Sequence, residues 1–228
     1  MQSSKAFAPA NISCIFRICP HENPRWSGSS GVGFTLNEGV FVEISRAKRS
    51  KVFFNRHPIN FPTVKSVITK LTKQKIRINI KSKLPLGCGF GLSGASSLAT
   101  AYAINNLLKL EKTNKELAII AHTSEVENKT GLGDVVNQYY GGFCVKLKPS
   151  SYFEVEKINL DNVDVYCRYF SKISTKSIIT NTKIINKINI AANDSLNKIK
   201  KLMNSNKIRF KNIIKISKEF SINSGLLK

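Results

Sequence analysis

The stretch LPLGCGFGLSGASSL, residues 84–98, constrains the fold of this chain more than any other segment. A tight turn needs one or two glycines, whereas four fall within eight positions here: Gly87, Gly89, Gly91 and Gly94. Residues 75–81 before it alternate between polar and apolar side chains, which predicts a half-buried strand. The residues after it place alanine and leucine at helical spacing. A strand, a glycine loop and a helix in this order predict a cradle of backbone N–H groups for an anion, and phosphate is the expected ligand.

The surrounding sequence disfavours two familiar kinds of phosphate loop. A Walker A loop is excluded because no Gly-Lys-Ser/Thr follows the glycines. Residues 89–94 do fit G-x-G-x-x-G, but a dinucleotide-binding unit needs a second strand after the helix, ending in an acidic residue. Here the next segment predicts another helix, opened by a capping box of Thr113 and Glu116. The phosphate loop therefore belongs to a different kind of fold.

Composition limits the class of protein and its partners. The 228 residues suffice for one large domain or two small ones. The net charge of +22 comes from lysines spread along the chain among many isoleucines and asparagines, so we expect a compositional bias and no nucleic-acid partner. We expect no membrane span, because no apolar run reaches about 18 residues. Five scattered cysteines without a CxxC pair and an N-terminus without a secretory signal predict free thiols in the cytoplasm.

The rest of the chain predicts a mixture of strands and helices. Strands are expected over residues 7–18, 51–55 and 143–148, and over 31–46 as two strands joined by a turn at Asn37-Glu38-Gly39. Helices are expected over 63–73, after the glycine loop, after Thr113, and from Asp134 to Tyr140. Beyond residue 150, YFEVEKINL (152–160) and VDVYCRYF (163–170) predict strands, and the chain from about Ser177 onward predicts helices.

Three segments, in order, resemble the motifs of the GHMP small-molecule kinases. Pro85-x-x-x-Gly89-Phe90-Gly91-x-Ser93-Gly94-Ala95 resembles the P-x-x-x-G-L-G-S-S-A-A loop of that family. APANISCIF (8–16) resembles its first motif, and TGLGDVVNQYYGG (130–142) resembles the segment that carries the catalytic aspartate in mevalonate kinases. The resemblance implies an α+β protein of the GHMP kinase fold. It implies an N-terminal α/β domain like domain 2 of ribosomal protein S5 over residues 1–148, and a smaller, truncated C-terminal α+β domain over residues 149–228.

Residues 6–148 most closely resemble the archaeal pantoate kinases within that family. This resemblance implies an enzyme of coenzyme A biosynthesis that uses ATP and Mg²⁺ to convert pantoate into 4-phosphopantoate, acting as a homodimer. Two alternatives stay open: a GHMP kinase for another small alcohol, homoserine- or mevalonate-like, and an inactive anion-binding remnant that lacks the family's third glycine-rich motif. Asn11 stands where mevalonate-type relatives have a lysine, which disfavours mevalonate.

The resemblance also assigns residues to the nucleotide and its metal. The ATP loop comprises Pro85, Gly87, Cys88, Gly89, Phe90, Gly91, Leu92, Ser93, Gly94 and Ala95. Ser93 and Glu125 are the expected Mg²⁺ ligands, with Glu127 as a rival to Glu125. Asp134 is the expected base for the attacking hydroxyl. Ser93 and Asp134 would also suit ordinary N-caps, and Glu125 an exposed helix position.

A carboxylate substrate requires a cation. Lys146, on the strand after Gly141-Gly142, is the expected partner, because relatives place a basic residue there; Arg17 and Arg25 are alternatives. Ser29 and Ser30 resemble residues of a loop on the substrate side in the family. The three histidines lack metal-ligand spacing, and His122 is expected to pack or hydrogen-bond beside Glu125.

Overall fold

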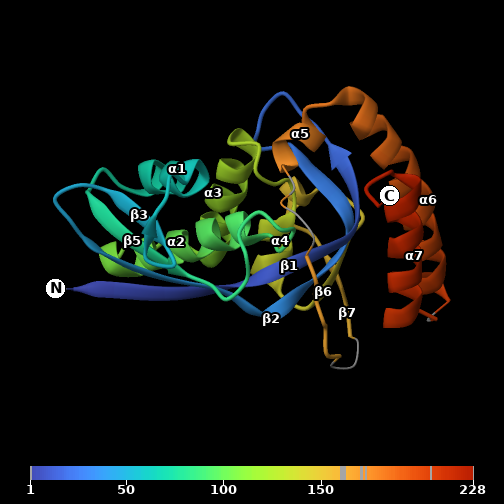
Figure 1. The fold of residues 1–228 in the computed structure, drawn as a ribbon, viewed down its shortest axis with the longest axis horizontal. Helices are drawn as coiled ribbons and strands as arrows, with labels where there is room; N and C mark the ends of the chain where they lie inside the picture. Colours follow the sequence, from blue (N-terminus) through green and yellow to red (C-terminus); the bar gives the residue numbers. More distant parts are fainter. Residues whose placement is uncertain (1, 160–162, 170–171, 173, 206, 228) are drawn as a thin grey trace.

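A computed structural model describes residues 2–159, 163–169, 172, 174–205 and 207–227. Its centre is a mixed sheet in the order β4-β3-β5-β2-β6-β7, with β1 paired to the other edge of β2 (Figure 1). The bounds of these strands are β1 Ser3–Cys19, β2 Gly28–Arg46, β3 Lys51–Phe54, β4 His57–Pro58, β5 Ile76–Lys81, β6 Phe143–Lys146 and β7 Glu156–Ile158. Together with the helices, this arrangement confirms the predicted α+β class.

Strand β2 is one continuous strand, so the predicted turn at Asn37-Glu38-Gly39 is wrong. It runs antiparallel to β1, and the pairing moves from Pro9↔Gly39 to Asn11↔Thr35. Over that step β2 advances by four residues and β1 by two, so the residues with turn propensity form a bulge in β2. A bulge and a tight turn favour the same residue types, so the sequence Asn37-Glu38-Gly39 could not distinguish between them.

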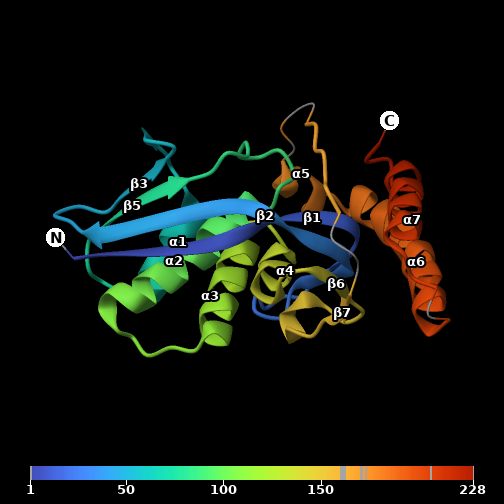
Figure 2. The ribbon, with the colours of Figure 1, turned by 90° about the horizontal axis from the view of Figure 1, so that it is seen from below.

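The two halves of β2 pair with different strands on its other edge. Residues 41–46 pair with β5, and residues 31–34 pair with β6. Figure 2 shows β1 and β2 running along the whole sheet, with helices α1 to α4 on one face. Consequently β5, which leads into the glycine loop, and β6, which carries Lys146, lie on the same edge of one strand.

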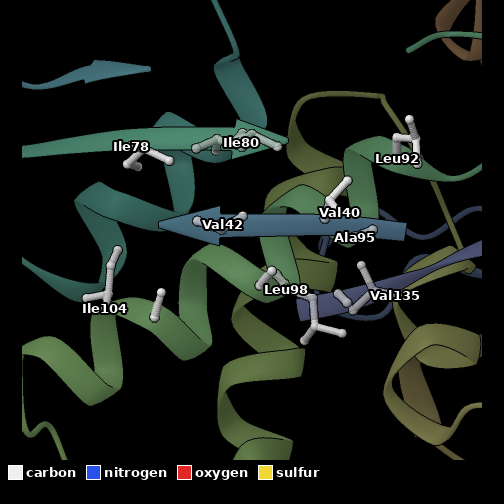
Figure 3. Close-up of a cluster of buried hydrophobic side chains, with 14 of the residues drawn as sticks. Val40, Val42, Ile78, Ile80, Leu92, Ala95, Leu98, Ile104 and Val135 are labelled. Atoms are coloured by element: carbon white, nitrogen blue, oxygen red, sulfur yellow. The ribbon is translucent and has the colours of Figure 1, made fainter. Parts of the chain in front are cut away.

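Four helices pack on this face to form the first hydrophobic core. They are α1 Pro62–Leu71, α2 Leu92–Leu108, α3 Asn114–Glu127 and α4 Asp134–Tyr140. Figure 3 shows Val40 and Val42 of β2 and Ile78 and Ile80 of β5 facing Leu98 and other buried residues of α2. Small residues dominate α2, so this helix is buried on most sides and lies between the sheet and the other helices. Its N-terminus, where the glycine loop ends, is thereby held in a fixed place.

Local signals set the helix ends that bear on the site. Pro62 occupies the first turn of α1, where its missing N–H costs nothing. The predicted capping box of Thr113 and Glu116 is present at the start of α3. The predicted short helix from Asp134 to Tyr140 is confirmed, and it ends at Gly141 with a positive φ of 68°.

The C-terminal part of the described chain adds a second core at one end of the sheet. This part of the chain comprises the 3-10 helix η1 (Ser150–Tyr152), β7, α5 (Thr175–Ile179), α6 (Thr182–Asn204) and α7 (Phe210–Asn223). Apolar residues of α6 and α7 pack against β1, β2 and β6. The predicted strand over 163–170 is wrong for residues 163–169, which are irregular and exposed; Phe170 lies outside the described residues. No described helix is long and apolar enough to cross a membrane.

Candidate active site

The glycine loop presents a row of backbone N–H groups at the N-terminus of α2. Gly87, Gly89 and Gly91 have φ angles of 81°, 84° and 60°, which side-chain-bearing residues rarely adopt. Among the described residues, the N–H groups of residues 89–94 donate to no other protein group. A Cβ atom on Gly89 would meet nothing within 4 Å, so this side of the loop is open. Free donors at a helix N-terminus suit an anion such as phosphate.

The inner side of the loop is fixed to the protein. The Phe90 carbonyl accepts a hydrogen bond of 3.0 Å from the Asn11 N–H, and the Gly91 carbonyl accepts one of 2.8 Å from Gln138 Nε2. The side chains of Phe90, Leu92 and Ala95 are buried in the first core. Pro85, Gly87 and Cys88 form the outer, more exposed part of the loop. The loop is therefore preformed.

Glu125 and Ser93 place two oxygens without partners beneath the loop. Glu125, on α3, is 1% exposed; its Oε1 accepts a hydrogen bond of 3.0 Å from Thr130 Oγ1. In the described part of the chain, Glu125 Oε2 and Ser93 Oγ are buried and make no hydrogen bond of normal geometry, although the Ser93 hydroxyl lies close enough to the carboxyl to affect its pKa. Burial, and then the nearby Asp134, raise the pKa of Glu125 to about 8, against the opposing effect of Ser93 and Thr130. Burial here favours the neutral acid, and a cation bound beside Oε2 would favour the carboxylate.

Glycines make room for the free oxygen of Glu125. A Cβ atom on Gly94 would lie 2.9 Å from Glu125 Oε2, and one on Gly131 would collide with the same oxygen. No cluster of three or more His, Cys, Asp or Glu side chains able to hold a metal occurs among the described residues. Ser93 and Glu125 nevertheless supply two hard oxygens, which fits Mg²⁺, an ion that keeps several of its waters.

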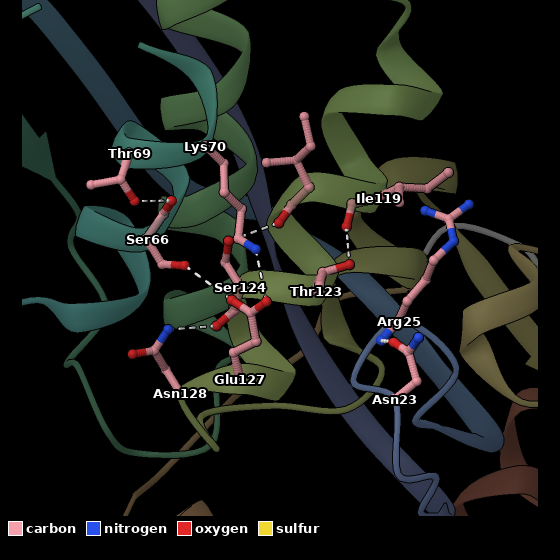
Figure 4. A network of polar contacts seen from close by, with 11 residues as sticks. Asn23, Arg25, Ser66, Thr69, Lys70, Ile119, Thr123, Ser124, Glu127 and Asn128 are labelled. Atoms are coloured by element: carbon pink, nitrogen blue, oxygen red, sulfur yellow. Dashed lines mark hydrogen bonds and ion pairs between the residues drawn. The ribbon is translucent and has the colours of Figure 1, made fainter. Parts of the chain in front are cut away.

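Glu127, the rival of Glu125, lies away from the loop. Its carboxylate accepts hydrogen bonds of 2.7 Å from Lys70 Nζ and 3.3 Å from Ser66 Oγ, both on α1 (Figure 4). Residues two apart lie on different faces of a helix, so only one of these two glutamates faces the loop. This geometry favours Glu125 as the metal ligand.

Asp134, at the first turn of α4, adjoins the loop at Gly91 and lies near Glu125. Its Oδ1 accepts hydrogen bonds of 2.6 Å from Asn11 Nδ2 and 3.3 Å from Ser13 Oγ. A Cβ atom on Gly91 would lie 3.2 Å from Asp134 Cγ, so the aspartate adjoins the loop. Burial raises the pKa of Asp134, whereas Lys146, Asn11 and Ser13 act in the opposite direction.

Lys146 of β6 is buried beside Asp134. Its Nζ donates hydrogen bonds of 2.7 Å to Asn137 Oδ1 and 3.1 Å to the Gly133 carbonyl. Burial lowers the pKa of Lys146 to about 8, although the charge of Asp134 opposes this change. Ser29 lies against Gly133 next to this ammonium group, and a Cβ atom on Gly133 would collide with the Ser29 hydroxyl. Lys146 and Ser29 are thus brought together near the proposed base.

Among the described residues, the side chains of Ser30 and Arg17 make no hydrogen bond to Lys146, Ser29 or Asp134. Ser30 is buried, and its hydroxyl has no partner among the described residues. The Arg17 guanidinium lies 3.8 Å from Cys19 Sγ, and within the described ranges it makes no hydrogen bond to Ser29, Lys146 or Asp134. The roles of Ser30 and Arg17 in substrate binding stay predictions.

Other residues, which sequence reasoning did not assign to the site, also border it. Asn137 bonds both Lys146 and Asn11; its spacing of three from Asp134 on one helix could have revealed it. Thr130 bonds Glu125. The side chain of Lys172, from a distant segment, comes within 3.8 Å of a Cβ position on Gly87. No local pattern predicts the last contact.

His122 was predicted to pack or hydrogen-bond, and it does both. Its Nε2 lies 3.1 Å from the Ser27 carbonyl, and its ring meets Phe153 edge-on at 5.8 Å between centroids. Burial is the main cause that lowers the pKa of His122 to about 4, and the charge of Lys146 adds to it. The His122 ring is therefore neutral at pH 7.

Comparison with known proteins matches this architecture. The sequence model of the GHMP kinases N terminal domain matches residues 62–142. A pantoate kinase of Methanocaldococcus jannaschii is 39% identical over 227 residues, which cover 97% of this chain and 80% of the relative. A pantoate kinase of Methanospirillum hungatei is 29% identical over 230 residues, which cover 97% of this chain and 76% of the relative.

Solved structures of related phosphotransferases share the fold of this chain. One described as a phosphotransferase related to CoA biosynthesis pathway superimposes with a TM-score of 0.81 at 27% identity, covering 100% of this chain and 77% of that one. The homoserine kinase of Cytophaga hutchinsonii, at 23% identity, has a TM-score of 0.61 over 95% of this chain and 71% of that one, and so shares the fold. Fold and site together define an ATP-dependent small-molecule phosphotransferase. The chain belongs to the GHMP kinase family, and within it to the pantoate kinases.

Proposed function

We propose that this protein transfers the γ-phosphoryl group of ATP to the hydroxyl of pantoate, giving 4-phosphopantoate and ADP. One observation carries the proposal: two buried oxygens without partners, on Ser93 and Glu125, lie beneath a row of free N–H groups and close to a carboxylate, Asp134. Phosphoryl transfer requires these parts, since its catalysis is mostly positioning and charge stabilisation. The pantoate kinases that match the chain supply the substrate.

The nucleotide would bind across the glycine loop. The N–H groups of residues 89–94 would hold the phosphate oxygens, aided by the positive end of the α2 dipole. A groove of about 610 Å³, bordered by Asn55, Ser82 and Lys83, lies where the chain enters the loop and offers room for the nucleoside. Ser93 Oγ and Glu125 Oε2 would hold the magnesium ion. When bound, Mg²⁺ neutralises charge on the phosphates.

Asp134 would take the proton of the attacking hydroxyl. The hydrogen bonds that Asn11 and Ser13 donate to Oδ1 favour the ionised carboxylate, which a base must have. They also fix its orientation, so the second oxygen, Oδ2, remains for the substrate. General-base catalysis of this kind is worth about 10²–10⁴-fold in rate.

Lys146 and Ser29 would recognise the carboxylate of pantoate. Lys146 is the buried ammonium group next to Asp134, and Ser29 lies beside it. A buried cation gives a strong, charge-assisted hydrogen bond to a carboxylate. A substrate hydroxyl and carboxylate could then be held at Asp134 and Lys146 at the same time.

The test is an ADP-release assay on the purified protein with ATP, Mg²⁺ and a panel of pantoate, homoserine and mevalonate, followed by mass spectrometry of the product. We expect turnover with pantoate and a phosphorylated pantoate product. Faster turnover with homoserine or mevalonate would overturn the assigned substrate. Turnover with none of them, in a folded protein that binds ATP, would overturn the assigned activity.

A further inference from the structure

A chain of side-chain hydrogen bonds joins Lys146 to Asp134. Lys146 Nζ donates to Asn137 Oδ1 at 2.7 Å, Asn137 Nδ2 donates to Asn11 Oδ1 at 2.9 Å, and Asn11 Nδ2 donates to Asp134 Oδ1 at 2.6 Å. The links come from β6, α4 and β1. Asn137 and Asn11 are each 1% exposed, and Lys146 is 4% exposed, so the two bonds that Asn137 makes are shielded from water; the bond from Asn11 to Asp134 is partly buried.

The lysine at one end fixes the direction of every bond in this chain. An ammonium group has only hydrogens to offer, so the carbonyl oxygen of Asn137 must face Lys146. The side-chain NH₂ group of Asn137 must then face Asn11, and Asn11 must turn its carbonyl oxygen toward that NH₂ group. The only part of Asn11 left for Asp134 is an N–H group. A reversed Asn11 would place a carbonyl oxygen against the carboxylate.

The backbone around the two amides is shaped to admit them. A Cβ atom on Gly33 of β2 would lie 2.6 Å from Asn137 Nδ2, so a glycine is needed where the amides meet. The Asn11 N–H donates to the Phe90 carbonyl, which ties this residue to the glycine loop as well. The chain of bonds is therefore built into the sheet and the loop.

We propose that Asn137 is a positioning residue. Because Lys146 can only donate, Asn137 must turn its N–H group toward Asn11, and Asn11 must then turn its own N–H group toward Asp134, the proposed base. We call this series of three hydrogen bonds the relay. This inference deepens the proposed function, on which it rests. It also gives Asn11 a role, because together with Asn137 this uncharged residue connects Asp134 to a lysine from β6. A hydrogen bond from Asn11 stabilises the ionised form of the carboxylate against its burial and orients it for the hydroxyl.

Steady-state kinetics of a double-mutant cycle test the coupling. Asn137→Ala and Asn11→Ala should each lower kcat by roughly 30-fold, with the KM for ATP changed less than about threefold. The double variant should be no more than about threefold slower than the slower single variant, because both substitutions interrupt the same series of hydrogen bonds. Losses that multiply, or losses in KM alone, would overturn the proposal.

Isosteric and control variants separate positioning from packing. Asn137→Asp keeps the shape and the acceptor for Lys146 but loses the donor to Asn11, so we expect a loss of kcat like that of Asn137→Ala. Unchanged turnover in Asn137→Asp would contradict the relay. Asn105→Ala is the control: Asn105 holds the N–H and carbonyl of Lys112 at the end of α2, and its loss should lower the melting temperature without lowering kcat.

A spectroscopic readout keeps the inference testable if turnover with pantoate fails. In ¹H–¹⁵N spectra of the full chain, the side-chain amide of Asn11 should have one proton shifted downfield by the short bond to Asp134. That signal should move upfield in Asn137→Asp, with the backbone signals of the same spectrum used to check that the variant is folded. An unchanged Asn11 signal would overturn the relay even in an active enzyme, whereas a shifted signal in a protein inactive with pantoate would overturn only the assigned substrate.

Discussion

The two carboxyl groups beside the glycine loop, the buried Glu125 and the half-buried Asp134, differ in what the protein provides for them. Asp134 Oδ1 receives two hydrogen bonds, and Lys146 lies nearby. Glu125 receives one bond at Oε1, while Oε2 has no partner in the described chain and two glycines leave room beside it. The protein thus offers the Asp134 carboxyl two donors and a nearby cation, which partly offset the burial that raises its pKa, whereas one oxygen of Glu125 is left without a donor. This difference is the basis on which we propose Asp134 as the base and Glu125 as the metal ligand.

The largest effect is expected at Asp134. Asp134→Asn should lower kcat by about 10³-fold, because the amide cannot accept the proton of the hydroxyl. The melting temperature should stay the same or rise, because burial raises the pKa of this carboxyl and charged burial does not favour folding. Rates and thermal unfolding of the same preparation check this. Near-normal turnover would remove Asp134 from the chemistry.

Glu125→Gln should act through the metal. We expect a loss of about 100-fold in kcat/KM for Mg·ATP, because the oxygen that needs a cation is replaced by an amide. Binding of ATP without metal should change little. A magnesium titration of activity checks this; a variant that needs no more Mg²⁺ than the wild type would contradict the assignment.

Lys146→Met tests whether Lys146 binds the carboxylate of pantoate. The KM for pantoate should rise by about 30-fold, because a buried carboxylate would lose its cation. The KM for ATP should hardly change, and Lys146→Arg should restore part of the affinity. If instead the KM for ATP rises and that for pantoate does not, the carboxylate binds elsewhere.

His122 extends the comparison to a neutral base. Its pKa is about 4 in the folded protein, below its ordinary value of 6.5, so the unfolded chain binds the proton first as the pH falls. The stability associated with a neutral His122 is therefore complete above pH 6.5 and is lost as the pH falls toward 4. His122→Gln should reduce this acid-side loss by roughly 2 kcal/mol. Urea unfolding of both proteins at pH 7.5 and 4.5 measures it; equal losses would contradict the shift.

The smallest effect is expected at the outer rim of the loop. Lys172→Ala should raise the KM for ATP by about threefold and leave kcat unchanged, because an exposed cation near phosphate contributes little in water. A rise that disappears at high salt would agree with this. Lys176→Ala, on α5, is a matched control of the same charge and should leave the KM for ATP unaltered.

The sequence predicted most elements of the first 148 residues and the residues of the loop, because these depend on local patterns. The alternation at Ile76, Ile78 and Ile80 and the capping box at Thr113 required no tertiary information. The bulge in β2 was mistaken for a turn, since both favour Asn and Gly, and only the pairing with β1 separates them. The roles assigned to the site residues, and the domain boundary at residue 148, stay predictions.

The contacts that complete the site could not be predicted, because they join residues far apart in the chain. Asn11 and Asn137 are 126 positions apart, and Lys172 reaches Gly87 from a segment with no motif. Glu125 was preferred to Glu127 from the sequence, but the contact of Glu127 with Lys70 on α1 could not be predicted. Local periodicity places a residue on a face, whereas packing decides what that face meets.

The division between the two carboxyl groups is tested most directly by calorimetric binding of a non-hydrolysable ATP analogue with and without Mg²⁺. Wild type and Asp134→Asn should both bind at least about tenfold more tightly with Mg²⁺, whereas Glu125→Gln should show no such gain. A gain that is lost in Asp134→Asn and kept in Glu125→Gln would reverse the roles of the two residues.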